Sequence, residues 1–240
     1  YIEMYHPPFL SSIQDKGIRA KSLESIFPSK TFPNHYSLVT GLTADHHGLV
    51  ANRFYDPERK DAYQLGNNKY TQDGSWYFGE PLWLSIKRQG LLTASYFWVG
   101  SDANIQGEHP SYYYDYDHGC DNELRTQQIV DWLKMPKEFR PHYLTLYFSV
   151  VDSAGHRFGP RSEQVKEQVL KVDKLISDMV AKIEDLKMPV NYIIVSDHGM
   201  KTIDPKKTVY LGKYEGVRYE ESGPIVLGYF EEGTSAKRKK

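Results

Sequence analysis

The sequence predicts an α/β protein built on a mostly parallel sheet sandwiched by helices. Short apolar runs at residues 91–98, 143–150 and 192–195 have the length of buried strands. They alternate with segments 122–133 and 161–186, whose apolar residues repeat at helical spacing. Strands that alternate with helices favour parallel pairing, with the crossover helices covering the faces of the sheet.

The first part of the chain predicts a helix over residues 9–17 and a strand over 18–22. A second helix is expected to begin at Thr31, which stands at an N-cap position. Pro33 is tolerated only in the first turn of a helix, and Gly41 is typical of the residue that follows a helix. Residues 29–42 therefore predict a short helix with a hydroxyl at its start.

The middle of the chain is expected to contain a helix over residues 81–89, closed by Gly90. Polar stretches predict loops elsewhere, at residues 43–55, 56–79 and 103–121. We expect the second of these to run over the surface. His46 and His47 stand among polar residues in the first, and we expect both to be solvated.

Composition limits the function classes. The 240 residues have a net charge of −1, without the basic excess of a protein that coats nucleic acid. The sequence contains no run of about 18 apolar residues, so it predicts no transmembrane segment. Cys120 is the only cysteine, which excludes an intrachain disulfide. We expect residues 1–240 to form a single domain, with the basic run 237–240 frayed at its end.

Thr31 has two interpretations from local sequence alone. Its hydroxyl either caps the helix or attacks a phosphate bound there, because the N–H groups at a helix N-terminus favour an anion. Caps are the commoner of the two, so the choice depends on the rest of the chain.

Acidic and imidazole side chains follow two of the predicted strands. These side chains are Asp152, His156, Asp197 and His198. Ligands of open α/β sheets bind beyond the carboxyl ends of the strands, so both pairs should lie at one edge. Carboxylate and imidazole groups suit zinc, although each pair alone is equally compatible with caps and loop histidines. We expect His35 to pack beside this site.

Two metal ions can clamp the attacking and leaving oxygens of a phosphoryl transfer. A threonine hydroxyl is a weak nucleophile that metal coordination activates. The combination of Thr31 with two metal-ligand pairs therefore predicts hydrolysis of a phosphate ester.

Five motifs in order closely resemble the nucleotide pyrophosphatase/phosphodiesterase family of the alkaline phosphatase superfamily. They are SKTFPNHYSLVTGL (29–42), HGLVAN (47–52), FWVGSD (97–102), DSAGHRFGP (152–160) and SDHGM (196–200). The resemblance implies an alkaline-phosphatase-like fold. It also implies hydrolysis of nucleotide phosphodiester or pyrophosphate bonds through a threonine-linked phosphoryl intermediate, with release of a nucleoside monophosphate.

The resemblance also implies roles for individual residues. Thr31 would be the metal-bound nucleophile, and the two zinc ions would be held by Asp197 with His198 and by Asp152 with His156. Asn52 would donate to a phosphate oxygen beside the backbone N–H of Phe32. Phe32 and a tyrosine of the downstream loop would sandwich the base. Tyr116 is the best match for that tyrosine, and Tyr113 is a nearby rival.

The family has two further metal ligands that this sequence lacks. One belongs to an Asp-Gly-Phe/Leu-Arg strand end before the threonine, and the other to a later Gly-x-His-Gly loop. We therefore expect the catalytic domain to be incomplete at both ends. Two alternatives stay open: a phospholipid or choline-phosphodiester hydrolase on the same scaffold, and a metal-poor nucleotide-binding protein. Family members usually act as secreted, periplasmic or surface enzymes, so a periplasmic or secreted setting is expected.

Overall fold

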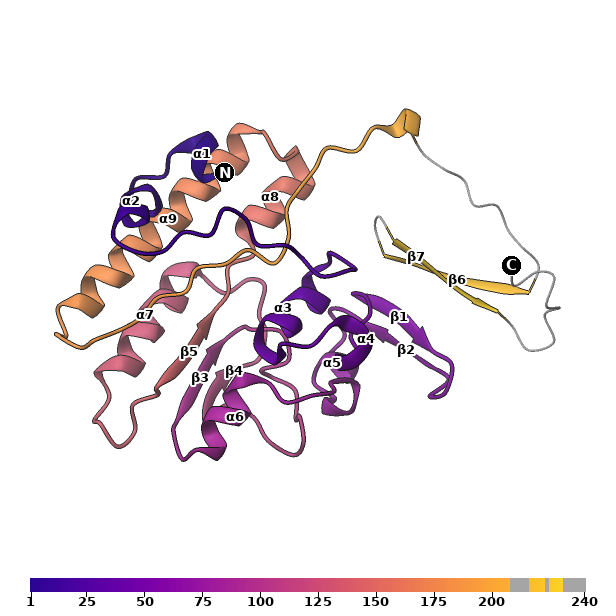
Figure 1. The fold of residues 1–240 in the computed structure, drawn as a ribbon, viewed down its shortest axis with the longest axis horizontal. Helices are drawn as coiled ribbons and strands as arrows, with labels where there is room; N and C mark the ends of the chain where they lie inside the picture. The colour runs from indigo at the N-terminus through magenta and orange to yellow at the C-terminus, as the bar shows by residue number, and fades with distance from the viewer. Residues whose placement is uncertain (208–215, 223–224, 231–240) are drawn as a thin grey trace.

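A computed structural model describes residues 1–207, 216–222 and 225–230 (Figure 1). The basic run at 237–240 lies outside these residues. Within them, no helix is long and apolar enough to cross a membrane.

The central sheet has three parallel strands. They are β3 (Thr93–Tyr96), β4 (Tyr112–Tyr114) and β5 (Tyr143–Leu146), in the order β4-β3-β5. The register pairs Thr93 with Tyr143 and Ala94 with Tyr112. The prediction of an α/β fold with parallel strands is confirmed, although β4 lies within a predicted loop and β5 ends four residues before the predicted strand does.

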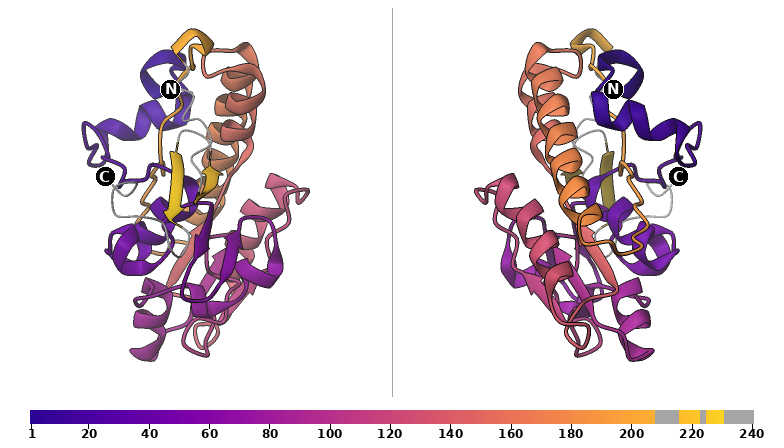
Figure 2. Two further views of the ribbon diagram at one scale, coloured as in Figure 1. Left: turned by 90° about the vertical axis from the view of Figure 1, so that its right-hand side faces the viewer. Right: turned by 90° about the vertical axis from the view of Figure 1, so that its left-hand side faces the viewer.

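Helices cover both faces of this sheet (Figures 1 and 2). On one face, α7 (Asn122–Lys134) and α9 (Glu163–Glu184) pack around Ala94, Tyr96 and Trp132. On the other lie α3 (Thr31–Thr40) and α6 (Leu82–Arg88), and Thr93 Oγ1 donates to the Trp83 carbonyl of α6. Because side chains alternate along a strand, β3 places side chains in the hydrophobic core on each face of the sheet.

The prediction that residues 43–79 are loops is wrong. They form α4 (Ala44–His47), β1 (Arg53–Asp56), β2 (Asp61–Gln64), α5 (Asn68–Thr71) and the 3-10 helix η2 (Gly74–Trp76), with β1 and β2 antiparallel. Tyr63 and Trp76 are buried in the core that α3 covers. Four aromatic rings of this stretch, those of Phe54, Tyr63, Trp76 and Tyr77, are buried in one cluster, although its average composition is polar.

His47 is buried, contrary to the expectation that it is solvated, whereas His46 is exposed as expected. His47 Nδ1 accepts the Leu49 N–H at 3.2 Å. His47 Nε2 lies 2.9 Å from Ser37 Oγ and 3.2 Å from the Pro33 carbonyl. Burial lowers the pKa of His47. The neutral ring therefore ties α4 to the first two turns of α3.

Two of the predicted strands, at residues 18–22 and 192–195, do not form. The N-terminal part forms α1 (Ile2–Tyr5), α2 (Pro8–Ser12) and the 3-10 helix η1 (Ile13–Asp15), and residues 18–22 are irregular. Residues 192–195 are also irregular, and Ile193 is 87% exposed. An apolar run forms a strand only where a neighbouring strand pairs with it, and no described strand pairs with this one.

The chain around residues 190–200 instead runs beside the segment that leads into α3 (Figure 1). Ser25 Oγ donates to the Asp197 carbonyl at 3.0 Å. After the 3-10 helix η3 (Pro205–Lys207), β6 (Val217–Ser222) and β7 (Ile225–Phe230) form an antiparallel hairpin. Glu220 of this hairpin pairs with Arg53 of β1 at 3.0 Å.

Asp173 of α9 fixes the N-terminal helix α2. The side chain is 3% exposed, and its carboxylate accepts the Phe9 N–H at 3.0 Å and the Leu10 N–H at 2.7 Å. These are the N–H groups that have no partner within the first turn of a helix. Two elements far apart in sequence are thereby joined through one carboxylate.

We expect Asp173→Ala to lower the free energy of unfolding by about 2 kcal/mol, because it leaves two helix N–H groups unpaired. Urea denaturation followed by circular dichroism measures the change. Asp178→Ala, on the same helix, is the control. It removes only an exposed pair with Lys174, so a loss below about 0.5 kcal/mol is expected. Equal losses in the two variants would contradict the bridging role of Asp173.

Asp102 lies in the turn that follows β3. Burial raises the pKa of its carboxyl to about 6. The folded chain therefore binds this proton more tightly than the unfolded chain, for which about 3.9 is usual. Stability attributable to this carboxyl is full at low pH and is lost as the pH rises from about 4 to about 6.

We expect Asp102→Asn to remove this pH dependence. Relative to wild type, its free energy of unfolding should rise by on the order of 2 kcal/mol between about pH 4 and about pH 7.5, because the amide has no charge to desolvate. Urea denaturation of both proteins at the two pH values tests this. A difference between the proteins that is the same at both pH values would contradict it.

Candidate active site

Helix α3 presents Thr31 in its first turn. Thr31 is the first residue of the helix and not its cap: Lys30 occupies the N-cap position in extended backbone, and no side chain caps the helix. Asn34 secures the approach, because its Oδ1 accepts the Ile26 N–H at 2.8 Å and its Nδ2 donates to the Pro28 carbonyl at 3.0 Å. The Thr31 hydroxyl is thus not engaged in capping.

The predicted pair Asp197 and His198 lies beside this hydroxyl. Thr31 Oγ1 is 3.3 Å from His198 Nε2, and His198 Nε2 is 3.2 Å from Asp197 Oδ2. His198 Nδ1 lies 2.9 Å from the Gly199 carbonyl and donates to it, so Nε2 keeps its lone pair. Three lone-pair donors, from residues 31, 197 and 198, therefore converge.

His35 supports this cluster from the second turn of α3. Its ring is buried, with Nδ1 2.8 Å from the Thr31 carbonyl and 3.4 Å from Asp197 Oδ2. Burial by itself raises the pKa of Asp197, but its contacts with the His35 and His198 imidazoles lower it overall. The carboxylate is accordingly held in its ionised, ligand-competent form.

The other predicted pair lies on a helix and not in a loop. Asp152 and His156 are one turn apart on α8 (Val150–Phe158), which begins soon after β5 ends. Asp152 Oδ1 is 3.4 Å from His156 Nε2. This buried oxygen accepts no hydrogen bond, which is unusual for a carboxylate oxygen. It therefore has a free coordination position.

The four predicted ligands thus form two pairs. Among residues 1–207, 216–222 and 225–230, no three His, Cys, Asp or Glu side chains are grouped as a ready metal site. The donors nevertheless fit zinc, because imidazole and carboxylate are its usual ligands. The unpartnered Asp152 oxygen and the converging donors at Thr31 are what metal ligands would leave without a metal.

Asn52 also lies at the start of α3, but its amide is arranged differently from the prediction. It directly precedes β1, and its Oδ1 accepts the Phe32 N–H at 3.0 Å. The Phe32 N–H is therefore engaged by Asn52 and does not stand free beside it. The amide nitrogen of Asn52 has no described acceptor and is the donor that remains for a ligand.

The structure separates the two candidate tyrosines. Tyr113 stacks on His109, with ring centroids 4.6 Å apart. The Tyr116 ring contacts Phe97 at 5.2 Å and Tyr147 at 6.3 Å. Tyr147 in turn lies against His35, so only Tyr116 is linked to the Thr31 cluster by described ring contacts. Phe32 packs at 6.0 Å against Tyr63 in the core beside α3.

Tyr147 is the site residue that the sequence analysis missed. Its ring lies 5.1 Å from the His35 ring. Burial, reinforced by the charges of Tyr116, Asp197 and Asp152, raises the pKa of its phenol. The pKa of Tyr147 is thus raised by a carboxylate from each of the two predicted ligand pairs. Its position at the carboxyl end of β5, just before the Asp152 motif, was the available signal.

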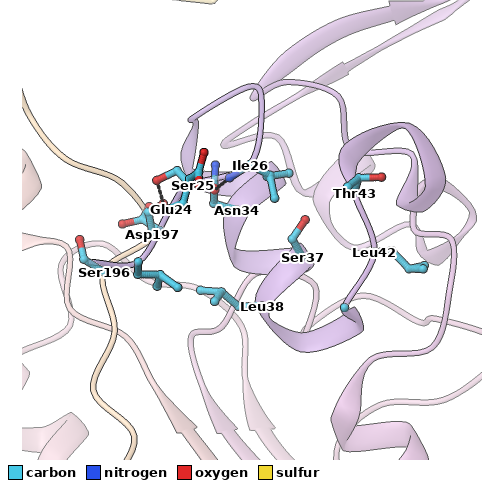
Figure 3. A pocket seen from close by; sticks show the side chains of 12 residues that line it. Glu24, Ser25, Ile26, Asn34, Ser37, Leu38, Leu42, Thr43, Ser196 and Asp197 are labelled. Carbon is cyan, nitrogen blue, oxygen red and sulfur yellow. Dashed lines mark hydrogen bonds between the residues drawn. The ribbon is translucent and has the colours of Figure 1, made fainter. Parts of the chain in front are cut away.

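A hollow of about 190 Å³ lies next to α3 (Figure 3). Ser37 and Leu38 of the helix line it, together with Ser25 and Asp197, which are joined by a hydrogen bond. Thr31 and Asn52 do not line it. The hollow therefore adjoins the Thr31 cluster only through Asp197 and does not contain the Thr31 hydroxyl.

The sequence is similar to known phosphodiesterases. The human ectonucleotide pyrophosphatase/phosphodiesterase family member 1 is 39% identical over 211 residues, which are 87% of this chain and 23% of the human one. The venom phosphodiesterase of Naja atra is 35% identical over 225 residues, 91% of this chain and 27% of its own. The chain thus spans about a quarter of the length of these relatives.

The fold is similar to a solved murine structure, that of ectonucleotide pyrophosphatase/phosphodiesterase 5. The TM-score is 0.90 at 28% identity, covering 97% of this chain and 63% of the murine one. An inactive variant of that murine protein in complex with AMP matches equally well, at 27% identity. The family model "Type I phosphodiesterase / nucleotide pyrophosphatase" matches residues 1–238. The chain belongs to the type I phosphodiesterase/nucleotide pyrophosphatase family.

Proposed function

We propose that the protein hydrolyses phosphodiester or pyrophosphate bonds of nucleotides, with Thr31 as the nucleophile and two zinc ions as cofactors. The observation that carries the proposal is the Thr31 hydroxyl, uncapped in the first turn of α3 and 3.3 Å from His198 Nε2. In support, an inactive threonine-to-alanine variant of the murine relative was solved with AMP.

Asp197 and His198 would hold one zinc ion together with Thr31, and Asp152 and His156 would hold the other. When bound, the metal ions would favour ionisation of the Thr31 hydroxyl and withdraw charge from the phosphoryl oxygens. His35 keeps Asp197 ionised and oriented. The helix N-terminus favours the anionic phosphoryl group.

In the first step the Thr31 oxygen forms a bond to phosphorus as the bond to the leaving oxygen breaks. The Asn52 amide would donate to an oxygen whose negative charge grows in the transition state. Water then hydrolyses the phosphothreonine, which restores the hydroxyl and releases a nucleoside monophosphate. Phe32 and Tyr116 would stack on the base, a contact that tolerates different bases.

We propose that the full-length protein contains the two metal ligands that this chain lacks. Residues 1–240 would then form part of one catalytic domain. We propose that it acts outside the cytoplasm, because the relatives include proteins named as ectoenzymes and venom enzymes.

Thr31→Ala should lower kcat/KM for the p-nitrophenyl ester of thymidine 5′-monophosphate by about a thousandfold or more, because it removes the proposed nucleophilic oxygen. The assay uses the full-length protein and follows release of p-nitrophenol. Thr40→Ala, at the other end of α3, removes a hydroxyl that donates to the Tyr36 carbonyl and accepts the Leu42 N–H. It should retain turnover. Near-wild-type turnover of Thr31→Ala would refute the mechanism.

Asp197→Asn should reduce the zinc bound per full-length protein from about two ions to about one, and activity with it, because a neutral amide is a poor zinc ligand. Mass spectrometry of the metal content, after dialysis against a fixed free zinc concentration, measures this. Asp204→Asn is the matched control from the same irregular segment. Unchanged zinc in Asp197→Asn would remove its ligand role. Wild type that binds AMP but no zinc would instead indicate a metal-poor nucleotide-binding protein.

A further inference from the structure

Arg125 is a buried charge in the first turn of α7. Its side chain is 1% exposed, and no carboxylate pairs with it in the described part of the chain. A buried guanidinium destabilises the fold unless its N–H groups are bonded. The partners that it does have therefore indicate why an arginine stands here.

Those partners are two backbone carbonyls in different segments. Arg125 Nη1 donates to the Tyr147 carbonyl at 3.1 Å, just after β5. Arg125 Nη2 donates to the Cys120 carbonyl at 2.8 Å, at the end of the loop that carries Tyr116. One planar group thus joins the residue that follows β5 to the loop that carries Tyr116.

The guanidinium also lies over the Phe97 ring, 4.9 Å from its centroid. Phe97 ends β3 in left-handed backbone, with φ of 68°, which is strained for an aromatic residue. Its ring contacts the Tyr116 ring edge-on at 5.2 Å. Arg125 and Tyr116 therefore both contact the Phe97 ring.

Tyr116 has two aromatic supports besides His118 of its own loop. They are Phe97 and Tyr147, and Arg125 contacts both. Arg125 Nε is buried without a hydrogen-bond partner. The fold therefore tolerates one unpaired buried N–H while it keeps the Arg125 contacts with Phe97 and Tyr147. A lysine has one nitrogen and no planar fork, and it cannot reproduce the three contacts together.

We propose that Arg125 is a positioning residue that fixes Tyr116 as one wall of the base-binding site, and so selects nucleotides over small phosphodiesters. The inference rests on the proposed function and adds a determinant of substrate class to it. A base that stacks on a fixed ring avoids the loss of conformational entropy that ordering the ring would require.

The test compares two substrates of the full-length zinc-loaded protein. The p-nitrophenyl ester of thymidine 5′-monophosphate and methyl p-nitrophenyl phosphate have the same leaving group, but only the first carries a base. In Arg125→Lys, the ratio of kcat/KM for the nucleotide to kcat/KM for the methyl ester should fall about tenfold, mostly through KM for the nucleotide.

Arg140→Lys is the matched control. Arg140 also donates to a backbone carbonyl, that of Met135, through Nε at 3.1 Å and Nη2 at 2.9 Å. It has no described contact with Tyr116, Phe97 or Tyr147. Its replacement should leave the substrate ratio within about twofold of wild type, because distant and independent sites do not couple. An equal fall of the ratio in both variants would overturn the proposal.

A double-mutant cycle tests whether Arg125 acts through Tyr116. In a Tyr116→Ala background, Arg125→Lys should lower the ratio by less than about twofold further, because the wall is already absent. Additive losses, or equal losses of both substrates in Arg125→Lys, would assign Arg125 a general structural role and overturn the proposal.

If Arg125→Lys does not fold by circular dichroism, Phe97→Leu replaces it. This variant removes the ring between Arg125 and Tyr116 and keeps both carbonyl bonds, and it should lower the same ratio. An unchanged ratio overturns the proposal. Wild-type hydrolysis of the nucleotide ester keeps the proposed function intact whichever result Arg125 gives. Absence of that hydrolysis overturns the proposed function and this inference with it.

Discussion

The contact between Thr31 and His198 is the constraint on which the candidate site depends. It joins the first turn of α3 to an irregular segment far along the chain. Ser25 adds a hydrogen bond to the Asp197 carbonyl, and His35 reaches the Asp197 carboxylate from within α3. Side-chain and backbone contacts together hold Asp197 and His198 where no described strand pairing does.

The second ligand pair depends on regular structure instead. Asp152 and His156 are one turn apart on α8, which follows strand β5 of the sheet. Tyr147 lies near both ligand pairs. Its ring contacts His35, and the charges of Asp197 and Asp152 both raise the pKa of its phenol. The same residue supports Tyr116 and accepts a hydrogen bond from Arg125. The proposed metal ligands and the proposed base-binding tyrosine therefore share one structural support, Tyr147.

Buried polar groups perform much of this positioning. His47, Asp173 and Arg125 are each almost fully buried, and each bonds to another segment of the chain. A buried polar group is favourable only with its partners in place, so such residues specify one arrangement of the elements around them. Here His47 fixes α3, and Arg125 fixes the Tyr116 loop.

The sequence alone determined the parallel α/β class, the position of the α3 helix, and the two Asp–His pairs, because apolar periodicity and residue type are local properties. Tertiary structure decided the rest. Tyr63 and Trp76 form a core inside a stretch of polar composition, and residues 192–195 stay unpaired despite an apolar run. Tyr116 was separated from Tyr113 only by the rings that each contacts. Burial and pairing depend on residues far apart in the chain, which local patterns do not encode.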